Sequence, residues 1–165
     1  MAERARSVAV TGALGNLGWK LLCHLAAHSA ITRLVGLDSR KASREQEAEL
    51  CQLAGDQSIA VDLIECDLSD WHDRRWRDPI EQIEAVVHFA YRSPFPNDTW
   101  DDANLSFDMT LNAAQATADS AGSDRFVFAT SNHVMGRYKA LPLAEGLGPG
   151  DLHPELTPGV GTRWH

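Results

Sequence analysis

Cysteines and long apolar segments are both scarce in this chain of 165 residues. Its three cysteines are odd in number and lack the spacing of metal ligands, so we expect neither a disulfide framework nor a metal site. Reduced thiols are typical of cytoplasmic proteins, which is the location we expect. No apolar run is long enough to span a bilayer or to form the core of a signal peptide, so we expect no membrane partner.

Basic residues are also in the minority. The sequence has 15 lysines and arginines against 23 aspartates and glutamates, which gives a net charge of −8. A surface of this sign repels a phosphate backbone, so we expect no nucleic-acid partner. The arginines at Arg74, Arg75 and Arg77 are too few and too mixed with acidic residues to form a basic stripe, and we interpret them as a solvated face.

What the chain does contain is a glycine-rich turn near its N-terminus. A short apolar run at 8–10 ends at Thr11, and leucines then recur at helical spacing as far as Leu25, which predicts a buried strand that turns into a helix. Glycines in such a turn allow positive φ and a close approach of backbone to a ligand, and the helix N-terminus offers N–H groups to an anion such as a pyrophosphate. The turn holds three glycines, Gly12, Gly15 and Gly18.

Asp38 is a carboxylate at the position where dinucleotide folds place an acid. Asp38 ends a second apolar run, 34–37, about twenty residues after the last glycine, where dinucleotide folds place the acid that accepts from ribose hydroxyls. A negative charge there favours NAD over NADP because it repels a 2′-phosphate, and the nearby Arg40 and Lys41 soften that preference. The alternative is that Asp38 only caps a loop.

Strands and helices are expected to alternate along the rest of the chain. Further strands are predicted at 59–66, 83–90 and 125–130. Further helices are predicted at 43–53, 71–77 and 98–121. This alternation predicts an α/β fold: a doubly wound parallel sheet of the Rossmann type, with about five strands in the order 3-2-1-4-5. A ligand would bind at the carboxyl ends of these strands.

Capping patterns predict where the helices begin and end. Ser43 and Gln46 form a capping-box pattern for the first of the three further helices. The pair at 69–70 is expected to cap the second, and Pro79 to end it. The third has Gly122 as its stop and an apolar face. That face comprises Trp100, Phe107, Leu111, Ala114 and Ala118.

Five short segments carry a family resemblance. They are 11–18 (TGALGNLG), Asp67-Leu68, 87–90 (VHFA), Asn104 in the long helix, and 128–136 (FATSNHVMG). In order and spacing they resemble motifs of the extended short-chain dehydrogenase/reductases, the NAD-dependent epimerase/dehydratase family, which includes sugar-nucleotide epimerases, dehydratases and uronate dehydrogenases. The Ser-Asn-His form of the last segment is most similar to uronate dehydrogenases.

The resemblance implies a role for each segment. In the family, hydride passes between NAD and a sugar or sugar-acid carbon, and a serine that corresponds to Ser131 is the catalytic residue that hydrogen-bonds the reacting oxygen. Ser131, Asn132 and His133 would bind the substrate, although His133 also fits a histidine that the backbone satisfies. Asn104 would support the active site, or is an ordinary polar helix position. The implied cofactor-binding residues are Gly12, Leu14, Gly15, Asn16, Leu17, Gly18, Asp38, Asp67, Leu68, Phe89, Ala90, Tyr91 and Asn104.

The family's catalytic Tyr-x-x-x-Lys pair has no counterpart in this sequence. Tyr91 is followed four residues later by Phe95, and Tyr138 by Pro142. We therefore expect the N-terminal portion of such an enzyme, truncated before the helix that carries the pair. It would comprise a dinucleotide-binding domain at 1–136 and an irregular tail at 137–165 that leads to a missing C-terminal part. Such a chain should bind NAD but turn over nothing alone.

The expected truncation also exposes apolar surface. The fifth strand would be a sheet edge, and the helix at 98–121 would lack the neighbour with which, in the family, it forms a dimer interface. We therefore expect a homodimer through that helix. Two alternatives stay open: a non-catalytic nucleotide-binding module that pairs with another chain, and a decayed product that folds poorly and binds no nucleotide.

Overall fold

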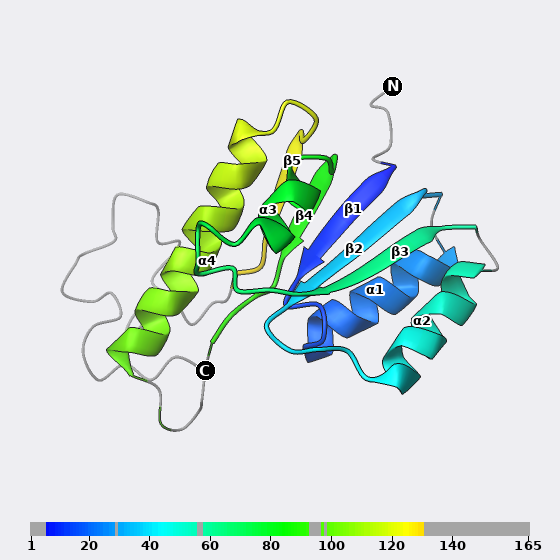
Figure 1. Ribbon diagram of the computed structural model, residues 1–165, viewed down its shortest axis with the longest axis horizontal. Coiled ribbons are helices and arrows are strands. Elements are labelled where there is room, and N and C mark those ends of the chain that lie inside the picture. Colours follow the sequence, from blue (N-terminus) through cyan, green and yellow to red (C-terminus); the bar gives the residue numbers. More distant parts are fainter. Residues whose placement is uncertain (1–5, 29, 56–57, 93–96, 98, 131–165) are drawn as a thin grey trace, which may run out of the picture.

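The computed structural model describes residues 6–28, 30–55, 58–92, 97 and 99–130 (Figure 1). Within these ranges, five strands form one parallel sheet in the order β3-β2-β1-β4-β5. This confirms the predicted doubly wound fold and its strand order. The strands are β1 (Ser7–Thr11), β2 (Arg33–Asp38), β3 (Ala60–Glu65), β4 (Ala85–His88) and β5 (Arg125–Phe128).

Helices cover both faces of the sheet (Figure 1). The helices α1 (Asn16–His28) and α2 (Arg44–Gly55) pack on one face, and α3 (Arg74–Ile80) and α4 (Trp100–Asp119) on the other. Alternate residues of β1 therefore enter different cores: Val10 packs on the α1 side and Ala9 on the α3 side. Burial of both faces explains why the strands read as short apolar runs. Every helix in the described part of the chain is too short or too polar to cross a lipid bilayer.

Side chains close the N-termini of α2 and α4. The predicted capping box of α2 is present, because Gln46 N donates to Ser43 Oγ at 3.2 Å and Ser43 N donates to Gln46 Oε1 at 3.0 Å. A second box starts α4, where Asp102 Oδ2 accepts from the Thr99 backbone N–H at 3.0 Å and from the Thr99 hydroxyl at 2.7 Å. These boxes fix the residue at which each helix begins.

The start of α3 differs from the prediction. Its N-cap is Asp73 rather than the 69–70 pair, because the Asp73 carboxylate accepts from the Arg75 backbone N–H at 3.0 Å. The helix therefore begins at Arg74, and the predicted start at 71 is wrong. Pro79 lies inside the helix, next to its last residue, so the prediction that it ends the helix is wrong as well. So close to the end, its missing N–H removes only one helical hydrogen bond.

The helix α4 packs on the sheet through small side chains, Ala113, Ala116 and Thr117. Three of its larger apolar side chains are exposed, whereas Met109 packs against the core, and β5 is the edge strand of the described sheet. This arrangement confirms the predicted exposure of apolar surface at the two elements. The exposed large side chains are Trp100, Phe107 and Leu111 of α4 and Val127 and Phe128 of β5.

Candidate functional site

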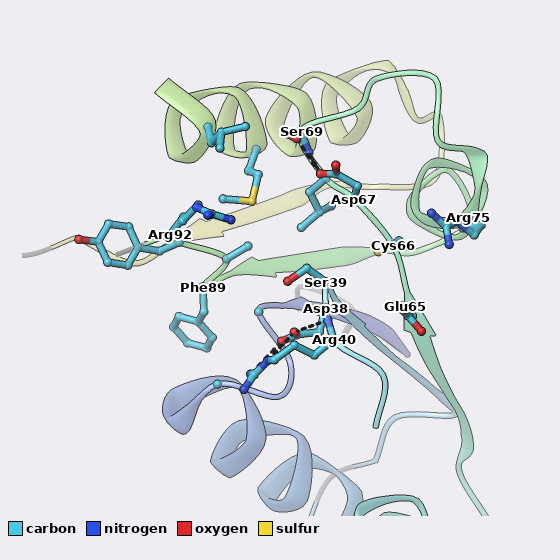
Figure 2. A pocket seen from close by; sticks show the side chains of 17 residues that line it. Asp38, Ser39, Arg40, Glu65, Cys66, Asp67, Ser69, Arg75, Phe89 and Arg92 are labelled. Carbon is cyan, nitrogen blue, oxygen red and sulfur yellow. Dashed lines mark hydrogen bonds and ion pairs between the residues drawn. The ribbon is translucent and has the colours of Figure 1, made fainter. Parts of the chain in front are cut away.

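Two adjoining cavities open at the carboxyl ends of the strands. The first, of about 560 Å³, is lined by polar and apolar groups in equal measure, and its charged side chains include Asp38, Arg40 and Asp67 at the ends of β2 and β3 (Figure 2). The second, of about 790 Å³, is lined mainly by apolar groups, including Phe107 and Phe128. We call them the polar cavity and the apolar cavity. They form one cleft, because both are lined by Gly12, Gly15, Phe89, Ala90 and Tyr91.

The glycine turn lies where the two cavities meet. Gly12 has a φ of +64°, and a Cβ on it would lie 2.8 Å from backbone atoms of Phe89 and Ala90. A Cβ on Gly18 would collide with the Gly12 carbonyl oxygen and lie 2.9 Å from Ala13 Cα. Glycine alone fits at these two positions, so the turn, the loop after β4 and the first turn of α1 all approach one another closely.

Backbone hydrogen bonds shape the turn and leave the start of α1 open. Gly15 N donates to Gly12 O at 3.0 Å, and Ala13 N donates to Leu37 O at 3.1 Å, which holds the turn against β2. The residues at 16–18 form the first turn of α1, where backbone N–H groups have no intrahelical acceptor, and all three line the apolar cavity. The positive end of the helix dipole therefore faces the cleft, which suits a phosphate group.

Asp38 ends β2 and is held from two directions. Its side chain is 8% exposed. The Leu14 backbone N–H donates to its Oδ2 at 2.9 Å, and Arg40 donates to its Oδ1 from the backbone N–H at 3.0 Å and from Nε at 3.1 Å. Figure 2 shows the Arg40 side chain folded back along this carboxylate. The carboxylate is thus fixed to the glycine turn, where the sequence predicts a ribose-binding acid.

The loop after β3 contributes Asp67 and Leu68 to the polar cavity. Asp67 Oδ1 accepts from the backbone N–H of Ser69 at 2.9 Å and from its hydroxyl at 2.6 Å, whereas Oδ2 has no partner among the described residues. Leu68 is buried, and its carbonyl oxygen accepts from Asn112 Nδ2 of α4 at 2.9 Å. Asn112 therefore ties this loop to α4. The Oδ2 atom of Asp67 is open to a donor.

An ion pair and a buried thiol complete this side of the cleft. Asp73 and Arg75 lie 2.8 Å apart, and the hydrogen bond from Arg75 lowers the pKa of Asp73 to about 2, so the carboxylate stays ionised. Cys66 lines the polar cavity, and burial raises the pKa of its thiol to about 12. The Cys66 thiol is therefore neutral and unreactive at ordinary pH. All three cysteines of the chain are free thiols.

A buried polar network holds the loop after β4 beneath the cleft. Thr11 Oγ1 accepts from the backbone N–H groups of Phe89 at 3.2 Å and Ala90 at 3.1 Å, so its own hydrogen is free to go to His88 Nδ1 at 2.8 Å. Thr110 Oγ1 of α4 donates to a carbonyl of its own helix and therefore accepts from His88 Nε2 at 3.0 Å. Burial lowers the pKa of His88 to about 4, which agrees with a neutral ring protonated at Nε2.

The apolar cavity has a different wall. Four large side chains line it while remaining largely exposed: Leu17, Tyr91, Phe107 and Phe128. Arg92 follows Tyr91 in the chain but lines the polar cavity, and its Nε lies 2.6 Å from Asp102 Oδ1 at the start of α4. The charged side chains of the cleft are therefore concentrated on the polar side.

The structure brings most of the predicted site residues to this cleft. Leu14 lies beside it, and its N–H serves to hold Asp38. Asn104 is exposed on α4 and lines neither cavity. The residues Ser131, Asn132 and His133 lie outside the described residues. The predicted residues that line one or both cavities are Gly12, Gly15, Asn16, Leu17, Gly18, Asp38, Asp67, Leu68, Phe89, Ala90 and Tyr91.

The family segments at 11–18 and 87–90 contain Thr11 and His88, but the sequence assigned no role to these two residues or to Thr110 and Asn112, which support the cleft from below. Thr11 and His88 both end apolar strands, and a polar residue at the buried end of a strand needs a partner, which is a signal that could have found them. Asn112 and Thr110 gave no such signal, because polar residues are ordinary on a helix with one exposed face.

The residues present fit a dinucleotide. The cleft offers free N–H groups beside a turn that excludes side chains, and it places a fixed carboxylate at the end of the adjacent strand. The fold is of the Rossmann type, and the cleft lies at the carboxyl ends of its strands. The model of the NAD dependent epimerase/dehydratase family matches residues 8–157, and the chain belongs to this family.

Relatives of known activity and structure are similar over most of this chain. An NAD-dependent glucose-6-phosphate dehydrogenase of Haloferax volcanii is 28% identical over 133 residues, which are 80% of this chain and 45% of that protein. A UDP-glucose-4-epimerase from Stenotrophomonas maltophila with bound NAD superposes with a TM-score of 0.63 at 21% identity, over 80% of this chain and 39% of that one. A ketoreductase domain from the bacillaene assembly line gives a TM-score of 0.61 at 22% identity, over 76% and 32%. The chain thus spans less than half the length of each.

Proposed function

We propose that this chain binds NAD and forms the cofactor-binding half of an oxidoreductase or epimerase that acts on a sugar or sugar-acid hydroxyl by hydride transfer. The observation that carries the proposal is the hydrogen bond of 2.9 Å from Leu14 N to Asp38 Oδ2, which joins the glycine turn to the carboxylate at one cleft. Membership of the NAD dependent epimerase/dehydratase family supports the same cofactor.

Each part of the cleft has a task in this proposal. The N–H groups at 16–18 bind the pyrophosphate, and Asp38 accepts from the hydroxyls of the adenosine ribose. The open oxygen of Asp67 accepts from the adenine amine, beside the buried Leu68. The loop at 89–91 lines the nicotinamide half. When bound, NAD supplies the hydride acceptor for the carbon that carries the reacting hydroxyl.

NAD is the proposed cofactor in preference to NADP. Asp38 is buried and ionisable, and it is attached to the turn beside the proposed ribose site. A 2′-phosphate placed against it would meet a like charge, whereas a free 2′-hydroxyl would meet an acceptor.

The proposed substrates are sugars or sugar acids, with uronic acids first. The support is the Ser131-Asn132-His133 segment and the activity of the Haloferax relative, which is named as a glucose-6-phosphate dehydrogenase. Ser131 is the proposed catalytic residue, and Asn132 and His133 are proposed to bind the substrate with it. No Tyr-x-x-x-Lys pair occurs in the sequence, so we propose that the chain binds NAD without turnover. Its free thiols support the proposal that it acts in the cytoplasm.

A binding titration and an activity assay on the same sample test this proposal. Calorimetry should detect NAD, while NADH absorbance should stay flat with a panel of uronic acids and sugar phosphates. NADH production above the enzyme-free rate would overturn the proposed inactivity but leave cofactor binding intact. Failure to bind NAD would overturn the proposed function as a whole.

The proposed partner is a second copy of the chain, bound through α4. Its exposed Phe107 and Leu111, with Phe128 of the neighbouring strand β5, form an apolar surface that association would bury. Sedimentation should therefore show a concentration-dependent dimer, and Leu111→Glu should shift it to monomer. A wild-type monomer at all concentrations would contradict the dimer.

A second candidate is a non-catalytic module that uses the nucleotide as a structural or sensing ligand and pairs with a different chain. The absence of the Tyr-x-x-x-Lys pair from the sequence favours it. Coding DNA beyond the codon for His165 distinguishes the two, because an in-frame or frameshifted Tyr-x-x-x-Lys supports the enzyme and a natural stop codon supports the module.

A further inference from the structure

The three arginines at 74, 75 and 77 form one solvated face in the sequence prediction, but the structure gives them different surroundings. Arg74 is 75% exposed and pairs with Asp78 at 2.8 Å. The guanidinium of Arg77 lies 4.2 Å from the centre of the Trp71 ring. Arg75 lines the polar cavity, so of the three it is the one that can reach a ligand bound there.

The Arg75 guanidinium is held in place by Asp73. Nε donates to Asp73 Oδ1 and Nη2 donates to Oδ2, both at 2.8 Å, so the two planar groups are joined by a pair of parallel hydrogen bonds. The same carboxylate accepts from the backbone N–H of Asp67 at 2.9 Å. Asp73 thus ties the guanidinium to the loop that carries Asp67, on the side of the cavity where β3 ends (Figure 2).

This pairing leaves one nitrogen of the guanidinium without a partner. Nη1 of Arg75 makes no hydrogen bond among the described residues. Oδ2 of Asp67 has no partner among them either. This end of the polar cavity therefore offers a ligand one free donor and one free acceptor, on two side chains that are fixed through the same carboxylate.

From this arrangement we infer that Arg75 belongs to the base-binding site and that its Nη1 donates to N7 of the adenine. The inference rests on the proposed function and deepens it. Adenine carries an amine donor and the N7 acceptor side by side on one edge of the base. Asp67 accepts from the amine, and Arg75 supplies the donor that N7 needs. Because Asp73 already fixes the guanidinium, this charge-assisted bond costs little further ordering of the side chain.

A role for Arg75 that is only structural leads to a different expectation. Asp73 keeps its bonds to the backbone N–H groups of Asp67 and Arg75 when the Arg75 side chain is removed. The loop after β3 and the cap of α3 therefore do not depend on the guanidinium. If the guanidinium acted through Asp67 instead, its removal would weaken the recognition of the amine rather than of the ring.

The test compares NAD with nicotinamide hypoxanthine dinucleotide, in which an oxygen replaces the adenine amine and N7 is kept. Calorimetric titration of the full chain measures both affinities. Wild type should bind NAD more tightly, because the oxygen of hypoxanthine faces the Asp67 carboxylate. Arg75→Ala, and Arg75→Met, which keeps much of the length of the side chain, should each bind both dinucleotides about tenfold more weakly. They should keep the wild-type ratio of the two affinities, because the contact to N7 is common to both ligands.

Two further variants serve as controls. Arg74→Ala removes the same charge one residue away, where the arginine makes a similar ion pair and does not line the polar cavity, so it should leave both affinities unchanged. Asp67→Asn should lower the preference for NAD over the hypoxanthine dinucleotide, because it removes the acceptor for the amine.

The outcomes separate this inference from the proposed function. Full affinity for NAD in both Arg75 variants would overturn the contact. A lost preference for NAD, with the hypoxanthine dinucleotide bound as before, would also overturn it and would make Arg75 a support of Asp67. An equal loss in Arg74→Ala would overturn it too, because the effect would then follow net charge. If wild type binds neither dinucleotide, the proposed function falls, and this inference falls with it.

Discussion

The two halves of the cleft are built in opposite ways. On the polar side, Asp38 pairs with Arg40 and Asp73 with Arg75, and Asp67 is tied to the Ser69 backbone N–H. In the apolar cavity, Leu17, Phe107 and Phe128 are more than half exposed, and apart from the backbone N–H groups at 16–18 the wall offers few polar groups. The described chain thus has a polar half whose charged groups are held in place and an apolar half that is largely exposed, and in the proposed function the polar half would bind the adenosine.

The largest expected effect is a loss of stability that involves His88, because the hydrogen bonds of this residue hold the loop that lines both halves of the cleft. Its pKa is lowered by burial to about 4 from an ordinary value of 6.5, so the unfolded state binds more protons between these two pH values. Stability is therefore full above pH 6.5 and falls as the pH drops from 6.5 to 4, by about 3 kcal/mol. Urea unfolding across this range measures the loss.

Two variants distinguish the contribution of the buried His88 ring to the acid sensitivity from that of the other histidines. His72 lies exposed on the surface, so His72→Gln should keep the wild-type pH dependence. His88→Asn should be less stable at pH 7 and should lose most of the slope between pH 4 and 6.5. A wild-type slope in His88→Asn would show that other groups cause the acid sensitivity.

A substitution at Gly15 tests the place where the polar and apolar cavities meet. Gly15 lines the two cavities, and a Cβ there would lie 3.1 Å from the Gly12 carbonyl oxygen, a tight contact, so a side chain at this position would press on the turn and fill space where the two cavities meet. We expect Gly15→Val to weaken NAD binding about a hundredfold, or about 2.7 kcal/mol, by calorimetry. Gly55→Val is the control, because a Cβ at that position meets no atom within 4 Å. Normal NAD binding by Gly15→Val would place the diphosphate elsewhere.

A substitution at Asp38 tests whether the negative charge of this side chain determines the choice between NAD and NADP. Asp38→Asn keeps the shape of the side chain but loses the charge, so NAD should bind about tenfold more weakly while NADP binding is maintained or improved. Asp62→Asn changes a half-exposed acid of β3 that pairs with Arg33, and it should leave both affinities unchanged. An equal loss for both cofactors in Asp38→Asn would mean that the carboxylate only holds the turn.

The smallest expected effect is a change in affinity that follows from altering the ligand rather than the protein. If the polar half supplies most of the recognition, ADP-ribose, which lacks the nicotinamide, should bind within about threefold of NAD, or about 0.65 kcal/mol. Competition titrations of the two ligands measure the ratio. A preference for NAD of a hundredfold would show that the apolar half contributes as much as the polar half.

Much of the fold could be read from the sequence because its signals are local. Apolar runs that end at Thr11 and Asp38 marked both strand ends at the cleft, and the glycine spacing marked the turn. The start of α3 was not readable, because Asp70 and Asp73 are both good N-caps. Asp73 is the cap in the structure, since its carboxylate reaches the backbone N–H groups of both Arg75 and Asp67.

The support beneath the site was harder to predict because its contacts join distant elements. The bond from Thr11 to His88 joins residues 77 apart in sequence, and that from His88 to Thr110 crosses from the sheet to α4. Periodicity found an apolar face on α4, but it could not tell which face the sheet would take. The sheet packs against Ala113, Ala116 and Thr117, because small side chains let the helix approach.

We propose that the turn at Gly12 and the acid at Asp38 form one dinucleotide site. Calorimetric titration of the well-folded wild-type chain with NAD tests it most directly. We expect saturable binding of one NAD per chain, and we expect ADP-ribose to compete with it. A folded sample that shows no saturable heat with NAD, or binding that ADP-ribose leaves undisturbed, would contradict it.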